Sequence, residues 1–302
     1  MKLLEKLCSI HAPSGEESKI SKFIIKYVNE NKQNWKKEPK IYFGDGFQDS
    51  IILKFGKPKT AIYAHLDSIG FTVKYNNEII KIGAPVIEKG TVLVGSDSCG
   101  KIEGKLIKKK DKIYIDFNRE IERGTTLTFK MNFKETKNYV QSCYMDNRLG
   151  VWNALKVAET LDNGLIVFSC WEEHGGGSVG FLTNFIYTKY NIHQALISDI
   201  TWITKGVKAG KGVVISLRDS AIPRKSYVNK IIDITKTTNI PFQLEVESSG
   251  GSDGNEIQSS PYPIDWCFIG AAEQNVHSPK EKVHKQDIKS MLKIYELLMK
   301  EL

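Results

Sequence analysis

The sequence predicts an α/β fold in which helices enclose a mixed, largely parallel β-sheet, with a small all-β insertion. Short apolar runs typical of buried strands recur along the chain, at residues 50–55, 60–63, 165–171 and 194–198. Amphipathic helical patterns lie among and around them, at residues 16–29, 151–161 and 287–302. The alternation of these two patterns is typical of sheets that are covered by helices.

The first and last of these helices are predicted from apolar residues at helical spacing. In the first they are Ile20, Phe23, Ile24 and Val28, with acidic residues in the first turn. The last helix has a longer apolar face, formed by Ile288, Met291, Leu292, Tyr295, Leu298 and Met299. We expect this helix to close the main domain.

Residues 71–141 follow a different pattern. Expected strands at 71–74, 112–117 and 126–129 are separated by turns rich in Gly, Asn and Lys, without a convincing helix between them. The predicted division is therefore a main domain, residues 1–70 and 142–302, and a β-rich insertion at 71–141.

The composition excludes several classes of protein. No apolar run approaches the roughly 18 residues of a membrane-spanning helix, and the first residues turn polar too early for a signal peptide. The net charge is +8, but the lysines are spread out and no basic face interleaved with aromatic residues indicates nucleic-acid binding. Five widely spaced cysteines encode neither a disulfide framework nor a zinc knuckle. We expect a cytoplasmic protein with neither a membrane nor a nucleic-acid partner.

Residues that could bind a metal ion recur where the expected strands end. His65 and Asp67 follow one apolar run, Asp199 follows another, and His277 lies beyond a third. Sites in open α/β sheets lie at the carboxyl ends of the strands, so the conjunction indicates one site. Taken alone, His65 would be better explained as a structural histidine.

Two acidic segments extend this set. Glu172 and Glu173 directly follow the apolar run 165–171, where carboxylates are costly to bury unless they are paired or bound to a metal. The glycines at 175–177 would end the strand and let both acids turn toward one cleft. Asp146 precedes a helix, where it could be an N-cap, or it could bridge two ions with its two oxygens.

Two histidines and three carboxylates form a donor set that suits zinc, cobalt or manganese, namely His65, His277, Asp146, Glu173 and Asp199. If Asp146 bridges two ions, each ion gains one histidine and one further carboxylate. Glu172 would then remain free as a general base, and Asp67 could orient His65.

Seven short segments resemble, in order, the motifs of the tetrahedral-type dinuclear metallo-aminopeptidases, the family of glutamyl, leucyl and lysyl aminopeptidases formerly called endoglucanases. These segments are APSGEE, AHLDSIGF, MDNRLG, WEEHG, SDIT, GGSDG and HSPKEKV, and they span nearly the whole chain. The resemblance implies a zinc-exopeptidase-like fold with two divalent ions, zinc before cobalt or manganese, that cleaves peptides at their N-terminus. It also implies a homo-oligomer, from a dimer up to a dodecamer, in which the insertion serves dimerisation or as a lid.

The resemblance further implies a role for each candidate residue. His65 and Asp199 would be terminal ligands, and Asp146 would bridge. Glu173 and His277 would bind the other ion. Glu172 would be the general base, and Asp67 would support His65.

This sequence departs from the family pattern at three positions. Asn147 stands where a second aspartate is usual, and Gly176 and Gly177 occupy a segment where an arginine is common. The chain is also short for the family, which leaves room for a trimmed insertion. The preferred N-terminal residue is not readable from the sequence. Its only indication is the net positive charge, which favours acidic substrates.

Other functions remain open at this stage. A related co-catalytic metal hydrolase, such as a deacylase or carboxypeptidase, would use the same residues. A serine hydrolase could use Ser178 in the G-x-S-x-G match at 176–180, but four residues separate that match from its strand. A non-catalytic binding protein would be expected to have lost part of this site. Glu172 and Glu173 are adjacent, which is a poor arrangement for glycoside hydrolysis.

Overall fold

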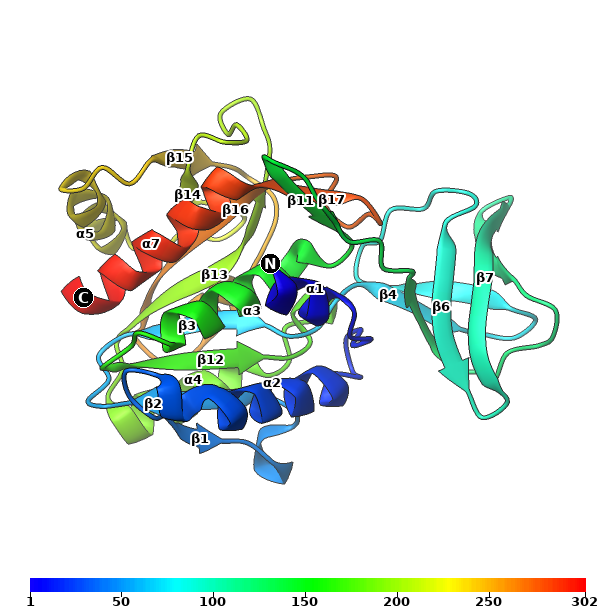
Figure 1. Ribbon diagram of the computed structural model, residues 1–302, viewed down its shortest axis with the longest axis horizontal. Helices are drawn as coiled ribbons and strands as arrows, with labels where there is room; N and C mark the ends of the chain where they lie inside the picture. Colours follow the sequence, from blue (N-terminus) through cyan, green and yellow to red (C-terminus); the bar gives the residue numbers. More distant parts are fainter.

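The computed structural model describes all residues from 1 to 302 and is organised around an eleven-stranded mixed sheet (Figure 1). The strands of this sheet are β1 (Lys40–Tyr42), β2 (Ile51–Phe55), β3 (Ala61–His65), β10 (Lys134–Glu135), β11 (Tyr139–Ser142), β12 (Gly164–Ser169), β13 (Gln194–Trp202), β14 (Val213–Arg218), β15 (Phe242–Val246), β16 (Asp265–Gln274) and β17 (Glu281–His284). At its centre β12, β3, β13 and β16 run parallel, and antiparallel strands flank them. The mixed, largely parallel sheet predicted from the sequence is confirmed.

Helices cover both faces of the sheet. They are α1 (Lys2–Cys8), α2 (Ser18–Asn31), α3 (Met145–Ala158), α4 (Val179–Tyr190), α5 (Lys225–Lys236), α6 (Asp253–Ser259) and α7 (Lys285–Glu301). Ile62 of β3 faces a large core shared with α1, α2, α3, α5 and α7, and its neighbour Tyr63 faces a second core shared with α4 and α6. Side chains alternate along a strand, so a fully apolar strand can serve two cores at once. No helix of the structure combines the length and the apolar character needed to cross a bilayer.

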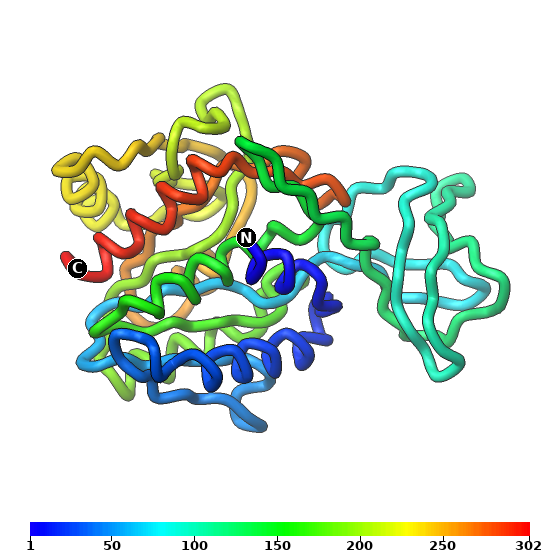
Figure 2. Tube along the Cα trace, viewed as in Figure 1, coloured from blue at the N-terminus to red at the C-terminus, as the bar shows by residue number.

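A closed six-stranded barrel projects from one end of this body (Figures 1 and 2). Its strands are β4 (Gly70–Val73), β5 (Glu78–Ile82), β6 (Val92–Asp97), β7 (Gly100–Lys109), β8 (Lys112–Asp116) and β9 (Thr126–Phe129). The barrel has its own apolar core, in which Phe71 and Phe129 pack edge to face. The chain returns through β10 and β11, which lie within the predicted insertion but pair with the main sheet through β17. The division at residues 70 and 142 stays a prediction.

Helix α3 approaches β13 closely at Gly150. A Cβ atom at this position would lie 2.0 Å from the Ser198 carbonyl oxygen and 2.1 Å from the Asn147 side-chain oxygen. We expect Gly150→Ala to lower the free energy of unfolding by about 3 kcal/mol, because neither neighbour can withdraw without moving the strand or the turn. Urea unfolding followed by circular dichroism measures this.

Gly180 provides the matched control for that substitution. It lies exposed in α4, and apart from its chain neighbours and the backbone of its own helix no atom lies within 4 Å of the position of an added Cβ. Alanine favours helices over glycine, so Gly180→Ala is expected to raise the free energy of unfolding by up to about 1 kcal/mol. Equal stability of the two variants would contradict the close approach of α3 and β13.

Candidate metal centre

The parallel strands bring the candidate residues to one edge of the sheet. The register pairs Ser169 of β12 with His65, the last residue of β3, so Glu172 and Glu173 follow just beyond this edge. On the other side Ile197 of β13 pairs with Tyr63, which sets Asp199 level with His65. Asp199 lies inside β13, because this strand continues beyond the predicted end at residue 198 to Trp202. His277 follows the end of β16.

The structure gathers the five candidate ligands into two groups that share Asp146. In the first, His65 Nε2 lies 3.2 Å from Asp146 Oδ1 and 3.6 Å from Asp199 Oδ2. In the second, His277 Nε2 lies 3.2 Å from Asp146 Oδ2 and 3.3 Å from Glu173 Oε2. Asp146 thus offers a different oxygen to each group, which is the arrangement a bridging carboxylate requires.

Backbone contacts hold Asp146 between the two groups. Tyr144 adopts a left-handed conformation with a φ of 66°, which turns the chain just before the carboxylate. Glu281 Oε2 accepts hydrogen bonds from the backbone N–H groups of Met145 at 2.6 Å and Asp146 at 3.4 Å. Asn147 is buried, and its amide contacts the main chain at Ser198 and Gly150 rather than the cluster.

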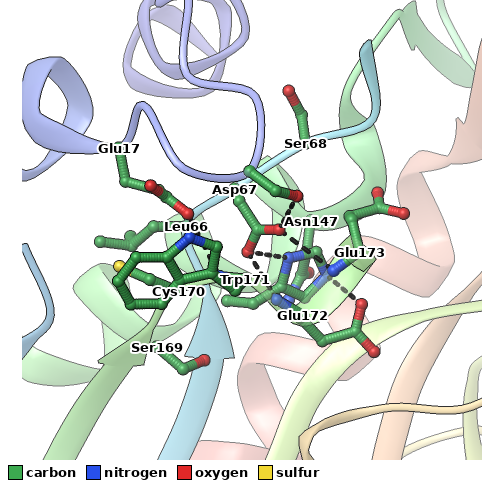
Figure 3. A network of polar contacts seen from close by, with 12 residues as sticks. Glu17, Leu66, Asp67, Ser68, Asn147, Ser169, Cys170, Trp171, Glu172 and Glu173 are labelled. Carbon is green, nitrogen blue, oxygen red and sulfur yellow. Dashed lines mark hydrogen bonds and ion pairs between the residues drawn. The ribbon is translucent and has the colours of Figure 1, made fainter. Parts of the chain in front are cut away.

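Asp67 lies between His65 and the glutamate pair, and Figure 3 shows its contacts with the two glutamates. Its carboxylate accepts hydrogen bonds from the backbone N–H groups of Glu172 and Glu173, both at 3.0 Å, and from the Ser14 hydroxyl at 2.6 Å. Its Oδ1 lies 3.4 Å from His65 Nδ1, a contact slightly too long for a strong hydrogen bond. Burial opposes ionisation, but the contacts with His65 and Ser14 outweigh it and lower the pKa of Asp67.

Glu172 belongs to neither ligand group. Its Oε2 lies 3.8 Å from His65 Nε2, and burial together with the nearby carboxylates raises its pKa to about 7. A carboxylate with a pKa near neutrality can both accept and return a proton. The turn that aims it begins at Trp171, which has a φ of 63°, so the chain leaves the strand before the glycines to which the sequence interpretation assigned this turn.

The residues of the two groups fit a pair of divalent cations. Burial and the nearby Asp146 raise the pKa of both Glu173 and Asp199 well above the usual range, as expected where carboxylates lack compensating charge. Glu173 Oε1 is buried without a hydrogen-bond donor. Buried polar atoms normally have a partner, and a cation would supply one here. The mixed imidazole and carboxylate donors suit zinc, cobalt or manganese.

A cavity of about 510 Å³ opens over the cluster, and its walls include Asp146, Glu172, Glu173, Asp199 and His277. His65 and Asp67 lie beneath it and are almost completely buried. Ser178 is also fully buried, and its hydroxyl bonds only to the backbone of Cys170, as donor to the carbonyl and acceptor from the N–H. This placement removes the support for a serine nucleophile at residue 178.

The sequence interpretation did not single out three buried acids near the site. Glu281 supports the Asp146 turn, Glu273 has no partner for either oxygen, and Asp253 accepts a hydrogen bond from the Ser169 hydroxyl at 2.6 Å. Two of them lie within the segments HSPKEKV and GGSDG, so the motifs contained a signal. Glu273 lies in none of the seven motifs, so only the pairing of β16 with β17 shows that it is buried near the site.

Removing the Glu281 carboxylate tests its support of the turn. We expect Glu281→Ala to lower the free energy of unfolding by about 1–3 kcal/mol, because two buried N–H groups lose their acceptor. Burial raises the pKa of Glu281 well above its usual range, so the neutral Glu281→Gln is a close control and should retain most of the stability. Thermal unfolding of both variants measures the difference. A stable alanine variant would show that the turn does not need this acceptor.

Comparison with known proteins places the chain in a family and supports its fold. The model of the M42 glutamyl aminopeptidase family matches residues 102–294. A protein of Acetivibrio thermocellus, provisionally named an aminopeptidase, is 29% identical over 97% of this chain and 96% of its own length. Among solved structures, the aminopeptidase APDkam598 of Desulfurococcus kamchatkensis superposes with a TM-score of 0.87, at 21% identity over 100% of this chain and 94% of its own. The TET1 peptidase of Pyrococcus horikoshii, reported to assemble into a tetrahedron or a large octahedral shell, gives a TM-score of 0.82 at 22% identity, covering 100% of this chain and 99% of its own.

Proposed function

The chain belongs to the M42 glutamyl aminopeptidase family, and on this basis we propose that it is an aminopeptidase that removes N-terminal residues from peptides with two divalent ions. The observation that carries the proposal is the position of Asp146. Its two oxygens face two separate histidine and carboxylate groups at the floor of one cavity. Zinc is the first choice of ion, and cobalt and manganese suit the same donors.

In this proposal His65 and Asp199 would hold one ion, Glu173 and His277 would hold the other, and Asp146 would contact both. Bound ions of this kind polarise a carbonyl group and lower the pKa of water. Glu172 accepts a proton from the water that attacks the scissile carbonyl, and then donates it to the leaving nitrogen. Asp67 faces His65 Nδ1 and fixes the backbone of both glutamates, so it positions the base and a ligand together.

The test is a panel of unblocked aminoacyl-p-nitroanilides, assayed before and after chelation and after zinc, cobalt or manganese is restored. We expect hydrolysis that chelation abolishes and a metal restores. N-acylated amino acids form the second arm of the panel, because a deacylase or carboxypeptidase would cleave them instead. Activity that survives chelation, or absence of activity on every substrate, would contradict the proposal.

We also propose that the chain forms a homo-oligomer, between a dimer and a dodecamer, and acts in the cytoplasm. The support is its similarity to peptidases such as TET1, for which large assemblies are reported. Light scattering coupled to size-exclusion chromatography measures the mass directly. A monomer at micromolar concentration would contradict this part of the proposal.

A further inference from the structure

The cavity over the metal centre continues away from the ligands into an acidic end. There it is lined by Asp219, Glu245 and Glu247, which follow or belong to the neighbouring strands β14 and β15, and by Thr201 and Trp202 of β13. None of these residues belongs to either ligand group. The role of the acidic end is therefore separate from metal binding.

The acidic end lies about one side-chain length from the metal centre. Thr201 is two residues beyond Asp199 on β13, so both side chains share a face of the strand at about 7 Å along the chain. The Thr201 hydroxyl donates a hydrogen bond to the Glu245 carboxylate. The acidic end is therefore within reach of the side chains of a substrate whose scissile bond lies at the metal centre.

The carboxylates of the acidic end have no cationic partner. Glu245 is 4% exposed and Asp219 is 8% exposed, yet neither takes part in an ion pair, and no lysine or arginine lines the cavity. The chain as a whole contains 43 lysines and arginines. Two bound divalent ions would offset only the ligand carboxylates and Glu172. Glu245 and Asp219 accept hydrogen bonds from neutral donors, the Thr201 hydroxyl and the Ala221 N–H, but these donors add no positive charge. Buried charges are normally paired, and a cationic ligand would pair Glu245 and Asp219 here.

We propose that this acidic end is the pocket for the side chain of the N-terminal residue and that it selects lysine and arginine. The inference rests on the proposed aminopeptidase function. Trp202 is 40% exposed beside the acids, where its ring can contact the aliphatic stem or the charge of such a side chain. A glutamyl substrate would instead be repelled. The local charge of the pocket thus opposes the preference for acidic substrates that the net charge suggests.

Isosteric substrates test the charge alone. Lysyl and arginyl p-nitroanilides are compared with the norleucyl and citrullyl compounds, which have nearly the same shape without the charge. We expect kcat/KM to be at least roughly tenfold higher for each charged member, the value of a hydrogen bond to a charged group. Equal rates within each pair would overturn the inference and leave the proposed aminopeptidase function intact.

Binding measurements test the charge preference of the pocket independently of catalytic turnover. Calorimetric titration of the metal-loaded Glu172→Gln protein with lysinamide and norleucinamide is expected to show at least roughly tenfold tighter binding of lysinamide. This measurement decides the inference even if no p-nitroanilide is cleaved, an outcome that would count against the proposed function. Equal affinities would overturn the pocket assignment.

Substitutions locate the preference within the pocket. Glu245→Gln is expected to reduce the ratio of lysyl to norleucyl kcat/KM about tenfold, mainly through KM. Glu247→Gln, at a more exposed position that tolerates change, should reduce the ratio in the same direction. Glu301→Gln, at the exposed end of α7, removes the same charge far from the cavity and should leave the ratio unchanged. A ratio that neither pocket variant lowers would overturn the assignment.

Discussion

Replacement of Glu172 by glutamine is expected to lower kcat about a thousandfold while both ions remain bound. Glutamine keeps the shape of the side chain but cannot accept the proton of the attacking water, and general bases contribute about 10²–10⁴ in rate. Glu172 belongs to neither ligand group, so its loss should not release metal. The measurements are steady-state hydrolysis of an aminoacyl-p-nitroanilide and the metal content of the dialysed protein.

The Glu301→Gln variant is the control, because it makes the same chemical change at an exposed position far from the cluster. It should retain the kcat of the original protein. If Glu172→Gln retains high activity, another group is the base. If it loses metal as well as activity, Glu172 is a ligand and the division of roles between the two glutamates is wrong.

Asp146→Asn is expected to have the second large effect, a fall in metal content from two ions per chain to one or none. The amide presents one oxygen and one NH₂ group, and the NH₂ group cannot coordinate a cation. One of the two ligand groups therefore loses the oxygen that residue 146 supplied to it. Activity should fall at least about a thousandfold, because the two ions act together. Mass spectrometry of metals after dialysis gives the stoichiometry.

Asp253→Asn is the matched control for that variant. Asp253 is also a buried aspartate near the cluster, but its carboxylate accepts a hydrogen bond from Ser169 and contacts no candidate ligand. This control should retain both ions. A full complement of metal in Asp146→Asn would show that Asp146 does not bridge, despite the contacts of its two oxygens with His65 and His277.

Much of the candidate site could be predicted from local sequence because of how parallel strands are arranged. An apolar run followed by a polar residue marks the end of a buried strand, and parallel strands end at the same edge. This logic placed His65, Glu172 and Glu173 together, and the structure brings them within the same cluster. It could not predict the turn at Trp171, because a left-handed conformation outside glycine is imposed by surrounding contacts.

The barrel shows the opposite case. Three of its strands were expected, whereas β5, β6 and β7 were not. β5 and β6 are short, and in β7 the inward position between Ile102 and Leu106 is Gly104, so the apolar alternation is interrupted in the sequence. Pairing of β11 with β17 joins segments more than a hundred residues apart, and no local pattern specifies such a partner. Long-range pairing depends on which faces are left to bury after the nearer contacts have formed.

By itself, the sequence determined the fold class, the order of the motifs and the identity of the side chains that could hold two ions. These follow from hydrophobic periodicity and donor chemistry, which are properties of short segments. Only the tertiary structure decided that Asp146 faces both histidines, that Glu281 holds the turn at Asp146, and that Glu245 lines the same cavity as Asp199 without a cationic partner. Distances and compensation of charge are properties of packing, because they depend on residues that meet only when the chain has folded.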